Sequence, residues 1–514
     1  MRLDFWNKKV EVSQKTFAPQ AWSQTGSFAV HYDGEKNLGE IGAIKEYIPD
    51  YDGLRLRSWQ AYLDSEITQT IMNKFCLWII GSGLKLQSEP SLAVLNSEKI
   101  ALKSDDFTES IEAKFHLFSK SKRADYAGLK TLNQIAKIAK KNAIIGGDVL
   151  VILRVINKEV TVQLIDGAHV SSPMYGNDFY EASKKNGNTI KNGIEQNAKG
   201  EHIAYYVRTK TAFKYERIEA KGKSSGLNMA FLVYGLEYRL NNNRGLPLIA
   251  AVLETLKKLE RYKEATLGSA EERQKIALFA EHMMGSTGEN PLLKNMVRAS
   301  GFKEDLPVDD SGKALNDTVT STTNKQFINM PVNSTLKQLE SKNELYFKEF
   351  YAVNIDLICA AIGIPREVAM SIYDSNFSAS RAALKDWEHT INVNRYEFST
   401  EFYQPIYNLF LDVEILKNKV TAPGYLEARA KKNYAVIESF QSARFVGVGV
   451  PHIDPLKEVK AERLKMGNTS DHIPLTTVER STEMLNGGDF KQNLSNFTKE
   501  LDQTKGIKPK EPTV

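Results

Sequence analysis

Hydrophobic and polar positions divide the N-terminal half of the chain into helices followed by strands. Apolar residues at near-helical spacing predict an amphipathic helix over 51–84, and further helical material follows over 106–144. The apolar positions of the first helix are Trp59, Tyr62, Ile67, Ile71 and Phe75. The period then changes, because the runs at 146–155, 160–166 and 202–210 are rich in β-branched and aromatic residues. This half of the chain therefore predicts a mixed α+β fold.

Long helices dominate the pattern of the second half. Pro247 suits the first turn of a helix, and an apolar stripe follows it along a helical pattern that persists to about Met284. The stripe consists of Ile249, Val252, Leu253, Leu256 and Leu259. The stretch 285–340 is rich in loop-forming residues, with short strand-like pieces such as QFINMPV. A small insert is therefore expected between this helix and the next.

A second long helix is predicted from Asn343 to Ile362. Its apolar face consists of Phe347, Phe350, Tyr351, Leu357, Ile358 and Ala361. Gly363 and Pro365 end this helix, and the polar stretch YDSNFSASRAAL (373–384) leads into a further helix predicted over 378–412. Small uncharged residues between two helices are typical of a surface loop. They also suit a loop that faces a highly charged partner without binding it tightly.

The C-terminal region predicts two separate helices. One begins near Asp454 and Pro455 and stops at Gly467. The other begins after Pro474, where Thr476 and Glu479 have the spacing of a capping box. The polar, lysine-rich tail from Lys499 onward is expected to be a flexible end.

The composition is that of a folded protein with several units. A chain of 514 residues is too long for one hydrophobic core, and its 42% hydrophobic and 25% charged content is typical of globular proteins. The net charge is +5, from 68 basic and 63 acidic residues. Proteins that hold nucleic acid tightly usually have a stronger basic bias. The charge therefore argues against tight wrapping of nucleic acid.

Cysteine usage and the apolar runs favour a soluble intracellular protein. Cys76 and Cys359 both lie in apolar runs, which predicts buried side chains and not a disulfide framework. The N-terminal MRLDFWNKK lacks the apolar run of a signal peptide. The longest apolar stretch, FCLWIIGSGL, is shorter than the ~20 residues that a membrane helix needs. We therefore expect no membrane partner.

The motifs that resemble enzyme signatures are incomplete. A phosphate-binding loop at AKGKSSG would need a glycine where Arg217 stands. The same stretch matches G-x-S-x-G around Ser224, but charged residues precede it where a nucleophile elbow needs a buried strand. A solvated loop is the favoured interpretation. In IIGSGLKL, Leu86 stands where a dinucleotide-binding fingerprint needs its third glycine, so we expect a turn at a strand.

The sequence also lacks a recognisable metal or acid–base cluster. Its eight histidines are scattered, without the spacing of a shared metal site. Asp309 and Asp310 lie in a turn-rich segment where acidic side chains are usually solvated. We therefore expect no catalytic residues, no metal and no cofactor.

Five stretches, in this order, resemble the lambda-type portal proteins of tailed bacteriophages. They are DGLRLRSWQAYLDSEITQTIMNKFCLWIIGSGLKLQ, GIEQNAKGEHIAYYVR, NNNRGLPLIAAVLETLKKLERYKEA, AIGIPREVAMSIYDSNFSASRAAL and RFVGVGVPHIDPLKEVKAERLKMGN. The third contains an Arg-Gly-x-Pro motif ahead of a long charged helix. The resemblance covers roughly residues 30–485, whereas 170–200 and 285–340 show little of it.

The resemblance implies an α+β phage portal fold with seven regions. They are a mixed α/β wing (1–245), a first stem helix (246–284), a small α/β clip (285–340), a second stem helix (341–364), a tunnel loop (365–379), a wing or channel helix (380–425), and a helical crown with a flexible C-terminal tail (426–514). It also implies a dodecameric ring at one capsid vertex, through which double-stranded DNA enters and leaves without sequence-specific contacts.

The same resemblance predicts which residues lie near DNA and near other proteins. The tunnel-loop set is Ser375, Asn376, Ser378, Arg381 and Lys385; the stem set is Lys257, Lys258, Arg261 and Lys348; the clip set is Lys294, Arg298 and Lys303. Two alternatives stay open. Ser378 can act as a helix cap, and the stem charges, six basic and six acidic between Pro247 and His282, can pair along the helix.

The implied partners are the terminase large subunit, head-completion or neck proteins, and the major capsid and scaffolding proteins. The implied location is the portal vertex of the virion, after assembly in the host cytoplasm. Two other classes of protein remain as alternatives. One is a nucleic-acid enzyme, which would need the phosphate or metal motifs that are missing. The other is a helical head-assembly adaptor or scaffolding protein without a DNA channel.

Overall fold

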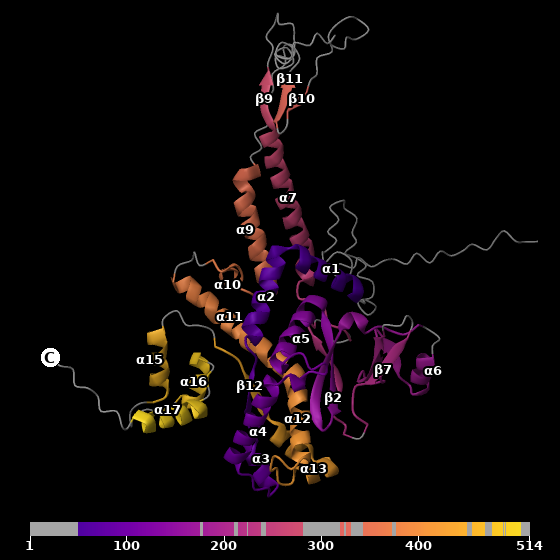
Figure 1. The fold of residues 1–514 in the computed structure, drawn as a ribbon, viewed down its shortest axis with the longest axis vertical. Helices are drawn as coiled ribbons and strands as arrows, with labels where there is room; N and C mark the ends of the chain where they lie inside the picture. The colour runs from indigo at the N-terminus through magenta and orange to yellow at the C-terminus, as the bar shows by residue number, and fades with distance from the viewer. Residues whose placement is uncertain are drawn as a thin grey trace, which may run out of the picture. The chain divides into compact units, whose positions relative to one another are not determined.

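The computed structural model describes residues 50–174, 178–209, 214–223, 225–237, 243–280, 319–322, 325–329, 343–372, 377–449, 455–467, 475–486, 488 and 490–504. The chain divides into two compact units. Unit 1 combines Met1–Glu254 with Cys359–Val514, and unit 2 is the continuous segment Thr255–Ile358. In sequence, unit 2 is therefore an insertion into unit 1 (Figure 1).

Unit 1 begins with two helices where the sequence predicted one. Helix α1 (Tyr51–Asp64) ends at Ser65, whose backbone is extended and whose hydroxyl accepts a hydrogen bond from the Thr68 amide at 3.5 Å. Helix α2 (Glu66–Ile80) therefore starts with its own cap. The turn at Gly81 and Gly83 then leads into strand β1 (Lys85–Ser88). The expected turn before a strand is present, but a helix precedes it.

Three further helices lead to the first sheet. They are α3 (Leu92–Ser97), α4 (Ser104–Lys120) and α5 (Leu132–Gly146), with a short 3-10 turn, η2, at Lys122–Ala124. Strands β2 (Asp148–Ile156), β3 (Glu159–Asp166) and β8 (Ala230–Tyr234) form an antiparallel sheet in the order β3-β2-β8. The strands predicted at 146–155 and 160–166 are thus confirmed.

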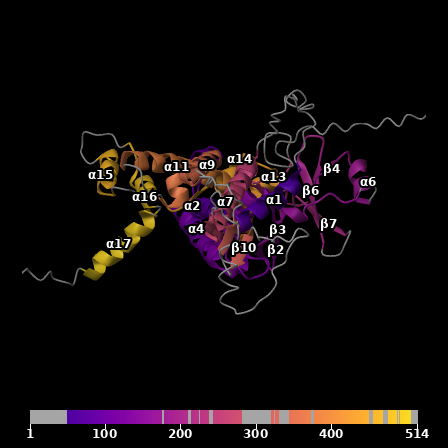
Figure 2. The same cartoon turned by 90° about the horizontal axis from the view of Figure 1, so that it is seen from above.

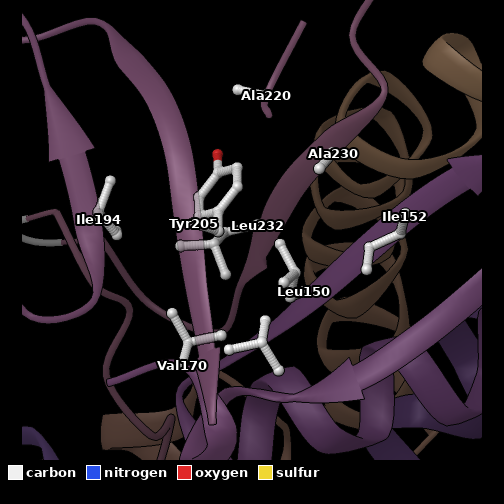
Figure 3. Close-up of a cluster of buried hydrophobic side chains, with 9 residues drawn as sticks. Leu150, Ile152, Val170, Ile194, Tyr205, Ala220, Ala230 and Leu232 are labelled. Atoms are coloured by element: carbon white, nitrogen blue, oxygen red, sulfur yellow. The ribbon is translucent and has the colours of Figure 1, made fainter. Parts of the chain in front are cut away.

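A second antiparallel sheet has the order β4-β5-β6-β7. Its strands are Thr189–Lys191, Ile194–Gln196, His202–Arg208 and Tyr215–Glu219, preceded by helix α6 (Asp178–Lys185) and the 3-10 turn η3 (Gly167–His169). Strand β6 confirms the prediction at 202–210. A buried cluster joins the two sheets, with Leu150 and Leu232 from one and Ile194 and Tyr205 from the other (Figure 3).

A long helical segment forms the second part of unit 1. After α10 (Arg366–Met370), helix α11 (Phe377–Phe398) continues through a π-helical turn, η5 (Ser399–Tyr403), into α12 (Gln404–Leu416), which confirms the helix predicted over 378–412. Trp387 of α11 is fully buried and its ring lies 5.8 Å from that of Phe75 in α2. Apolar burial of this kind is the main force that holds such helices together.

The region expected to form a helical crown contains a strand. Helices α13 (Tyr425–Lys431) and α14 (Tyr434–Gln441) are followed by β12 (Ala443–Val446), which pairs antiparallel with β1. Phe445 of β12 lies 6.3 Å, between ring centroids, from Phe115 of α4. Strand β12 therefore packs with the N-terminal part of unit 1, through its pairing with β1 and its aromatic contact with α4.

Three helices end the described chain: α15 (Pro455–Lys465), α16 (Val478–Asn486) and α17 (Phe490–Thr504). The first two confirm the C-terminal helices predicted from the sequence. The capping residue is one position off, since the Arg480 amide donates to the Thr477 hydroxyl at 3.2 Å. The Thr476 hydroxyl instead lies 3.4 Å from that of Ser481.

Unit 2 contains two helices and a small sheet. Helix α7 (Leu253–Lys275) follows the 3-10 turn η4 (Ala250–Val252), and α9 (Asn343–Ile362) has the predicted bounds. The two helices lie side by side (Figures 1 and 2), with Tyr262 stacked on Phe347 at 5.7 Å. Strands β9 (Ile276–Ala280), β10 (Val319–Thr322) and β11 (Lys325–Asn329) form a sheet in the order β10-β11-β9.

Two details of unit 2 differ from the sequence prediction. The first helix was expected over 246–284, but residues Ile276–Ala280 form a strand parallel to β11. A short apolar run is compatible with a helix or a strand, and the hydrogen bonds to β11 make this run a strand. On α9, Ile358 is buried as expected, whereas Phe350 and Leu357 are 42% and 60% exposed.

Candidate functional site

The segment 365–379, predicted as a loop, is half helix. Gly363, at φ +80°, ends α9, and the amides of Gly363 and Ile364 both donate to the Cys359 carbonyl, at 2.9 and 3.0 Å. Helix α10 follows at once and buries Val368 and Ala369 completely or nearly so. The loop is therefore shorter than predicted, because apolar residues of its first part pack into unit 1.

The short loop after α10 is fixed at its start. Ser371 has the left-handed φ of +56°, and its hydroxyl accepts a hydrogen bond of 2.8 Å from the Lys74 ammonium of α2. Ser375 and Asn376, the predicted tip, lie outside the described residues. Ser378 belongs to the first turn of α11. Its predicted role, like that of the tip, stays a prediction.

Arg381 and Lys385, which were predicted to lie near DNA, each form an ion pair with a glutamate. Arg381 lies 3.3 Å from Glu458 of α15, and Lys385 lies 2.7 Å from Glu388 one turn along α11. Their side chains are 48% and 55% exposed, so both remain accessible to solvent. Pairing reduces the local positive charge without removing access. The arrangement suits weak contacts with a polyanion better than tight binding.

The four predicted stem cations lie on unit 2 and are all exposed. They are Lys257, Lys258 and Arg261 of α7 and Lys348 of α9. The apolar stripe on α7 is buried as predicted, with Leu256 and Leu259 at 3% and 1% exposure. Along the same helix, Lys263 lies 3.9 Å from Glu260. At least one basic and one acidic residue of α7 therefore pair along the helix, as the alternative interpretation of the stem charges expects.

The predicted clip residues Lys294, Arg298 and Lys303 lie outside the described residues. Strand β11 confirms the strand-like piece at QFIN, and its parallel partner β9 precedes the predicted start of the clip. The sheet of unit 2 therefore contains strands from both sides of residue 285, the predicted start of the clip.

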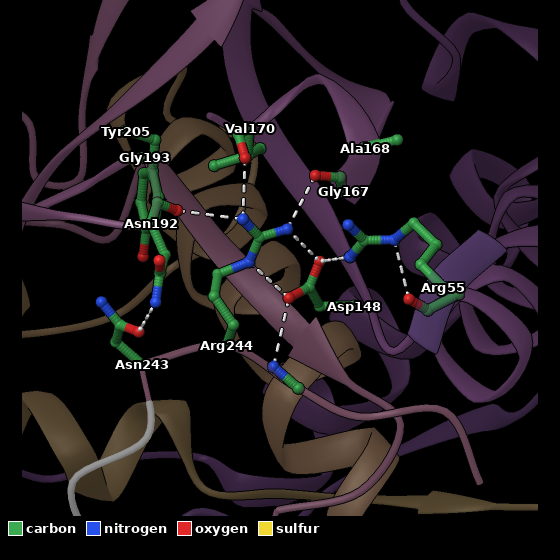
Figure 4. A network of polar contacts seen from close by, with 12 residues as sticks. Arg55, Asp148, Gly167, Ala168, Val170, Asn192, Gly193, Tyr205, Asn243 and Arg244 are labelled. Carbon is green, nitrogen blue, oxygen red and sulfur yellow. Dashed lines mark hydrogen bonds and ion pairs between the residues drawn. The ribbon is translucent and has the colours of Figure 1, made fainter. Parts of the chain in front are cut away.

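A buried ionic network is the polar centre of unit 1, and sequence reasoning missed it. Asp148, at the start of β2, accepts hydrogen bonds from Arg55 at 2.6 Å and from Arg244 at 2.6 and 2.8 Å (Figure 4). Arg244 also donates to the carbonyls of Gly167, Val170 and Asn192, at 2.7, 2.7 and 2.9 Å. All these donors converge on one small volume between the two sheets and the segment that precedes α7.

The charge balance of this network is set by its two guanidinium groups. Burial alone would raise the pKa of the Asp148 carboxyl, but Arg244 and Arg55 outweigh it and hold this pKa below its usual range. Arg244 belongs to the Arg-Gly-x-Pro motif of the sequence. Gly245 is required for a different reason, because a Cβ there would lie 2.1 Å from the Gly147 carbonyl oxygen. The motif therefore fixes the path of the backbone ahead of α7.

A cleft of about 800 Å³ lies along the π-helical turn and β12. Its polar lining includes Arg395, Ser399, Thr400 and Gln404 of the segment from α11 to α12, and Arg444 of β12. Arg395 is 9% exposed and donates to the carbonyls of Ile79 and Val448. Its guanidinium is thus committed to the backbone. Acidic and basic groups are mixed along the cleft, which indicates no preference for an anion.

Glu401 of the π-helical turn is half-buried, and Lys140 of α5 is buried. Burial raises the pKa of Glu401 to about 7, although Lys140 acts in the opposite direction. Burial also lowers the pKa of Lys140, whose ammonium lies 5.7 Å from the centre of the Phe398 ring. The π-helical turn is a property of the folded backbone, and no sequence pattern indicated it.

The described residues contain no group of three or more His, Cys, Asp and Glu side chains arranged to hold a metal ion. In the helices that the structure describes, no stretch combines the length and the hydrophobicity that crossing a membrane requires. Cys76 and Cys359 are both buried, as predicted. Burial raises the pKa of the Cys76 thiol to about 11, which disfavours the reactive thiolate form.

Comparison with known proteins gives one family match. The family described as phage portal protein, lambda family, matches residues 37–395. No curated protein matches the sequence.

Among solved structures, the chain is similar to one described as the neck of an empty GTA particle computed with C6 symmetry. Identity is 11% and the TM-score 0.42, over 85% of this chain and 94% of that one. A second is described as the virion of a native gene transfer agent (GTA) particle, at 11% identity, a TM-score of 0.33, and 75% and 94% coverage. A third is described as the neck of a native GTA particle computed with C12 symmetry, at 9% identity, a TM-score of 0.30, and 80% and 97% coverage. At these TM-scores, the likeness of structure carries no argument beyond the family match.

Proposed function

Because the chain belongs to the lambda family of phage portal proteins, we propose that it forms the ring-shaped DNA channel at one capsid vertex. The genome would enter through this channel during packaging and leave through it during ejection. The observation that carries the proposal is the family match, which covers residues 37–395 and so includes both long helices of unit 2. The family is structural and not enzymatic.

The charge distribution of unit 2 supports passage of DNA over binding of DNA. The exposed cations Lys257, Lys258, Arg261 and Lys348 share their helices with acidic residues, such as Glu260 and Glu264. Each cation that neutralises a phosphate adds salt-dependent affinity, and many such contacts would hold DNA in place. A surface with balanced charge keeps the contacts weak and independent of sequence. Double-stranded DNA can then slide past.

An exposed apolar row on α9 supports assembly into a ring. Phe350, Val353 and Leu357, spaced three and four residues apart, are 42%, 57% and 60% exposed. A helix with such a row usually buries it against another protein surface. A neighbouring copy of unit 2 would supply that surface, and a dodecamer is the ring size that the family resemblance implies.

The regions then take the roles of portal domains. Unit 1 supplies the wing, α7 and α9 the stem, the sheet of unit 2 the base of the clip, and the segment after α10 the tunnel loop. We propose the terminase large subunit and the neck proteins as partners of the clip, and the major capsid and scaffolding proteins as partners of the wing and crown. The ring would assemble in the host cytoplasm and stay at the portal vertex of the virion.

Electron microscopy of the purified chain tests the proposal directly. We expect rings with a central hole in negative stain, and packaging of DNA when the rings are combined with heads and motor protein. Solid particles or monomers that never form rings would contradict the proposal and favour a head-assembly adaptor without a channel.

A further inference from the structure

One end of the first sheet carries an exposed face that continues outward from the core. Ile152, Arg154 and Ile156 alternate along β2 and therefore share one face of the sheet. Ile152 is buried in the cluster between the two sheets (Figure 3), whereas Ile156 is 41% exposed. The chain then turns into β3 at Asn157 and Lys158, whose φ values of +52° and +63° are typical of a two-residue hairpin. The tip of this hairpin therefore exposes an apolar side chain.

The loop that follows η2 lies along the edge of β3 and is held by hydrogen bonds. The Tyr126 amide donates to the Val162 carbonyl of β3 at 3.0 Å. The Asp125 carboxylate closes the loop, because it accepts from the amides of Leu129 and Lys130 at 2.9 and 3.0 Å. A surface that is formed in advance costs a binding partner less entropy than a surface that must first be ordered.

Two side chains of this loop add to the apolar surface at this end of the sheet. Tyr126 and Leu129 are 47% and 65% exposed. The Arg154 guanidinium lies over the Tyr126 ring, 5.2 Å from its centre. We refer to the exposed side chains of residues 122–130, together with those of Arg154 and of 156–159, as the hairpin patch. Tyrosine and arginine side chains placed together are typical of the centre of a protein interface.

The charge of the hairpin patch is positive. The stretches 122–130 and 154–159 carry five basic and two acidic residues, in a chain whose totals are 68 and 63. Of the two acidic residues, Asp125 accepts hydrogen bonds from its own loop, and Glu159 lies 2.9 Å from Arg123. Complementary charge guides a partner to its site and disfavours partners of the same sign. The patch therefore favours an acidic partner.

The apolar members of the patch favour a protein over a nucleic acid. Most contacts to DNA and RNA are made to phosphates and sugars by polar and cationic side chains, which gives Leu129 and Ile156 no matching surface. A protein interface buries such side chains at its centre. A second hairpin patch is disfavoured as the occupant, because two surfaces of the same net charge repel each other.

We propose that the hairpin patch binds an acidic segment, with apolar side chains of its own, on another protein of the particle. This inference rests on the proposed function, which supplies the particle. It adds a defined surface of unit 1 and the chemistry of the segment that the surface binds.

Photo-cross-linking of the full-length protein in assembling particles tests the contact. p-Benzoylphenylalanine in place of Tyr126 reacts on illumination with a molecule that lies against the patch, and mass spectrometry identifies the cross-linked segment. We expect one segment of another head protein, with net negative charge and apolar side chains. The same amino acid in place of Tyr434, an exposed tyrosine of α14, is the matched control and should not capture this segment.

Charge reversal gives a second measurement. Lys130→Glu combined with Lys158→Glu should lower the yield of the cross-link at least about tenfold, because both changes oppose the acidic segment. Lys99→Glu combined with Lys199→Glu, which reverses two exposed lysines outside the patch, should leave the yield unchanged.

The outcomes separate this contact from the proposed function. If wild-type chains form no rings, the proposed function fails. If rings enter particles but position 126 cross-links to DNA, to another copy of this chain or to nothing, the ring stands and the proposed contact is wrong. The contact is also wrong if the reversal at Lys130 and Lys158 leaves the cross-link unchanged.

Discussion

Asp148 and Arg244 form a two-hydrogen-bond ion pair, at 2.6 and 2.8 Å, in which both side chains are at most 3% exposed. The pair joins the first residue of β2 to the segment ahead of α7. A buried charge that loses its partner is costly, because water cannot replace the lost interaction. The stability of unit 1 should therefore depend strongly on this pair.

The variant Asp148→Asn tests this dependence, since it keeps the shape and removes the charge. We expect the free energy of unfolding to fall by about 3–5 kcal/mol, because Arg244 stays buried without its counter-charge and Arg55 keeps only the more distant, exposed Asp52. Urea denaturation followed by tryptophan fluorescence measures the change. The exposed Asp64→Asn is the control and should change stability by less than about 0.5 kcal/mol.

The same pair predicts a pH dependence. The pKa of Asp148 is lower in the folded chain than in the unfolded chain, so its stabilisation is complete above the unfolded pKa. It is lost as the pH falls through the folded pKa. The stability difference between wild type and Asp148→Asn should therefore shrink in strong acid. A difference that stays constant down to the acid unfolding limit would show that charge is not the cause.

A second prediction concerns Gly147, which ends α5 at φ +99° and faces Gly245. A Cβ at Gly147 would lie 2.6 Å from the Gly245 carbonyl oxygen, so backbone must move. We expect Gly147→Ala to lower the thermal transition temperature of the chain. Gly268→Ala, inside α7 with no neighbour within 4 Å, should instead stabilise by about 0.5–1 kcal/mol through helix propensity.

A third prediction follows from Glu401, whose pKa burial raises to about 7 from an ordinary value of 4.5. Ionisation is disfavoured in the folded chain, so stability should decrease as the pH rises from about 5 to 8. Glu401→Gln should remove this decrease, as seen in urea midpoints taken across that range. Asp64→Asn, exposed at the end of α1, is the control. Parallel curves for wild type and Glu401→Gln would rule out the assignment.

A fourth prediction concerns the loop before α11. Asn376→Glu would place a ring of negative charge where DNA is proposed to pass, and repulsion of the phosphates should impair packaging while rings still assemble. Asn376→Gln, which adds no charge, should package normally. DNA protection assays with matched ring concentrations measure both. Normal packaging by fully assembled Asn376→Glu rings would mean that the loop does not line the channel.

Local pattern predicted much of the fold. The bounds of α9 and the positions of β2, β3 and β6 follow from residue period, since a buried stripe or a β-branched run is a property of a few neighbouring residues. The break at Ser65 was missed because the apolar spacing continues across it. The end of α7 was missed because the run Ile276–Ala280 becomes a strand only through pairing with β11.

The candidate site was less predictable, because its contacts join distant parts of the chain. Arg244 lies 96 positions from Asp148, and Glu458 lies 77 positions from Arg381. No short motif encodes either pairing. For Arg381, the sequence indicated a cation near DNA, and the structure adds an acidic partner that weakens its charge. The roles of Ser375, Asn376 and the clip cations stay predictions.

The pairing of β1 with β12 has a consequence for biosynthesis. Gln87 and Arg444 are hydrogen-bonded partners 357 positions apart, with all of unit 2 encoded between them. At about 5–20 residues per second, a ribosome delivers β12 on the order of tens of seconds after β1. Throughout that interval the edge of β1 and the aromatic surface of α4 have no partner from the second part of unit 1. A nascent chain interrupted before Ala443 cannot complete unit 1, so premature products are expected to go to chaperones and proteases and not into assembling particles.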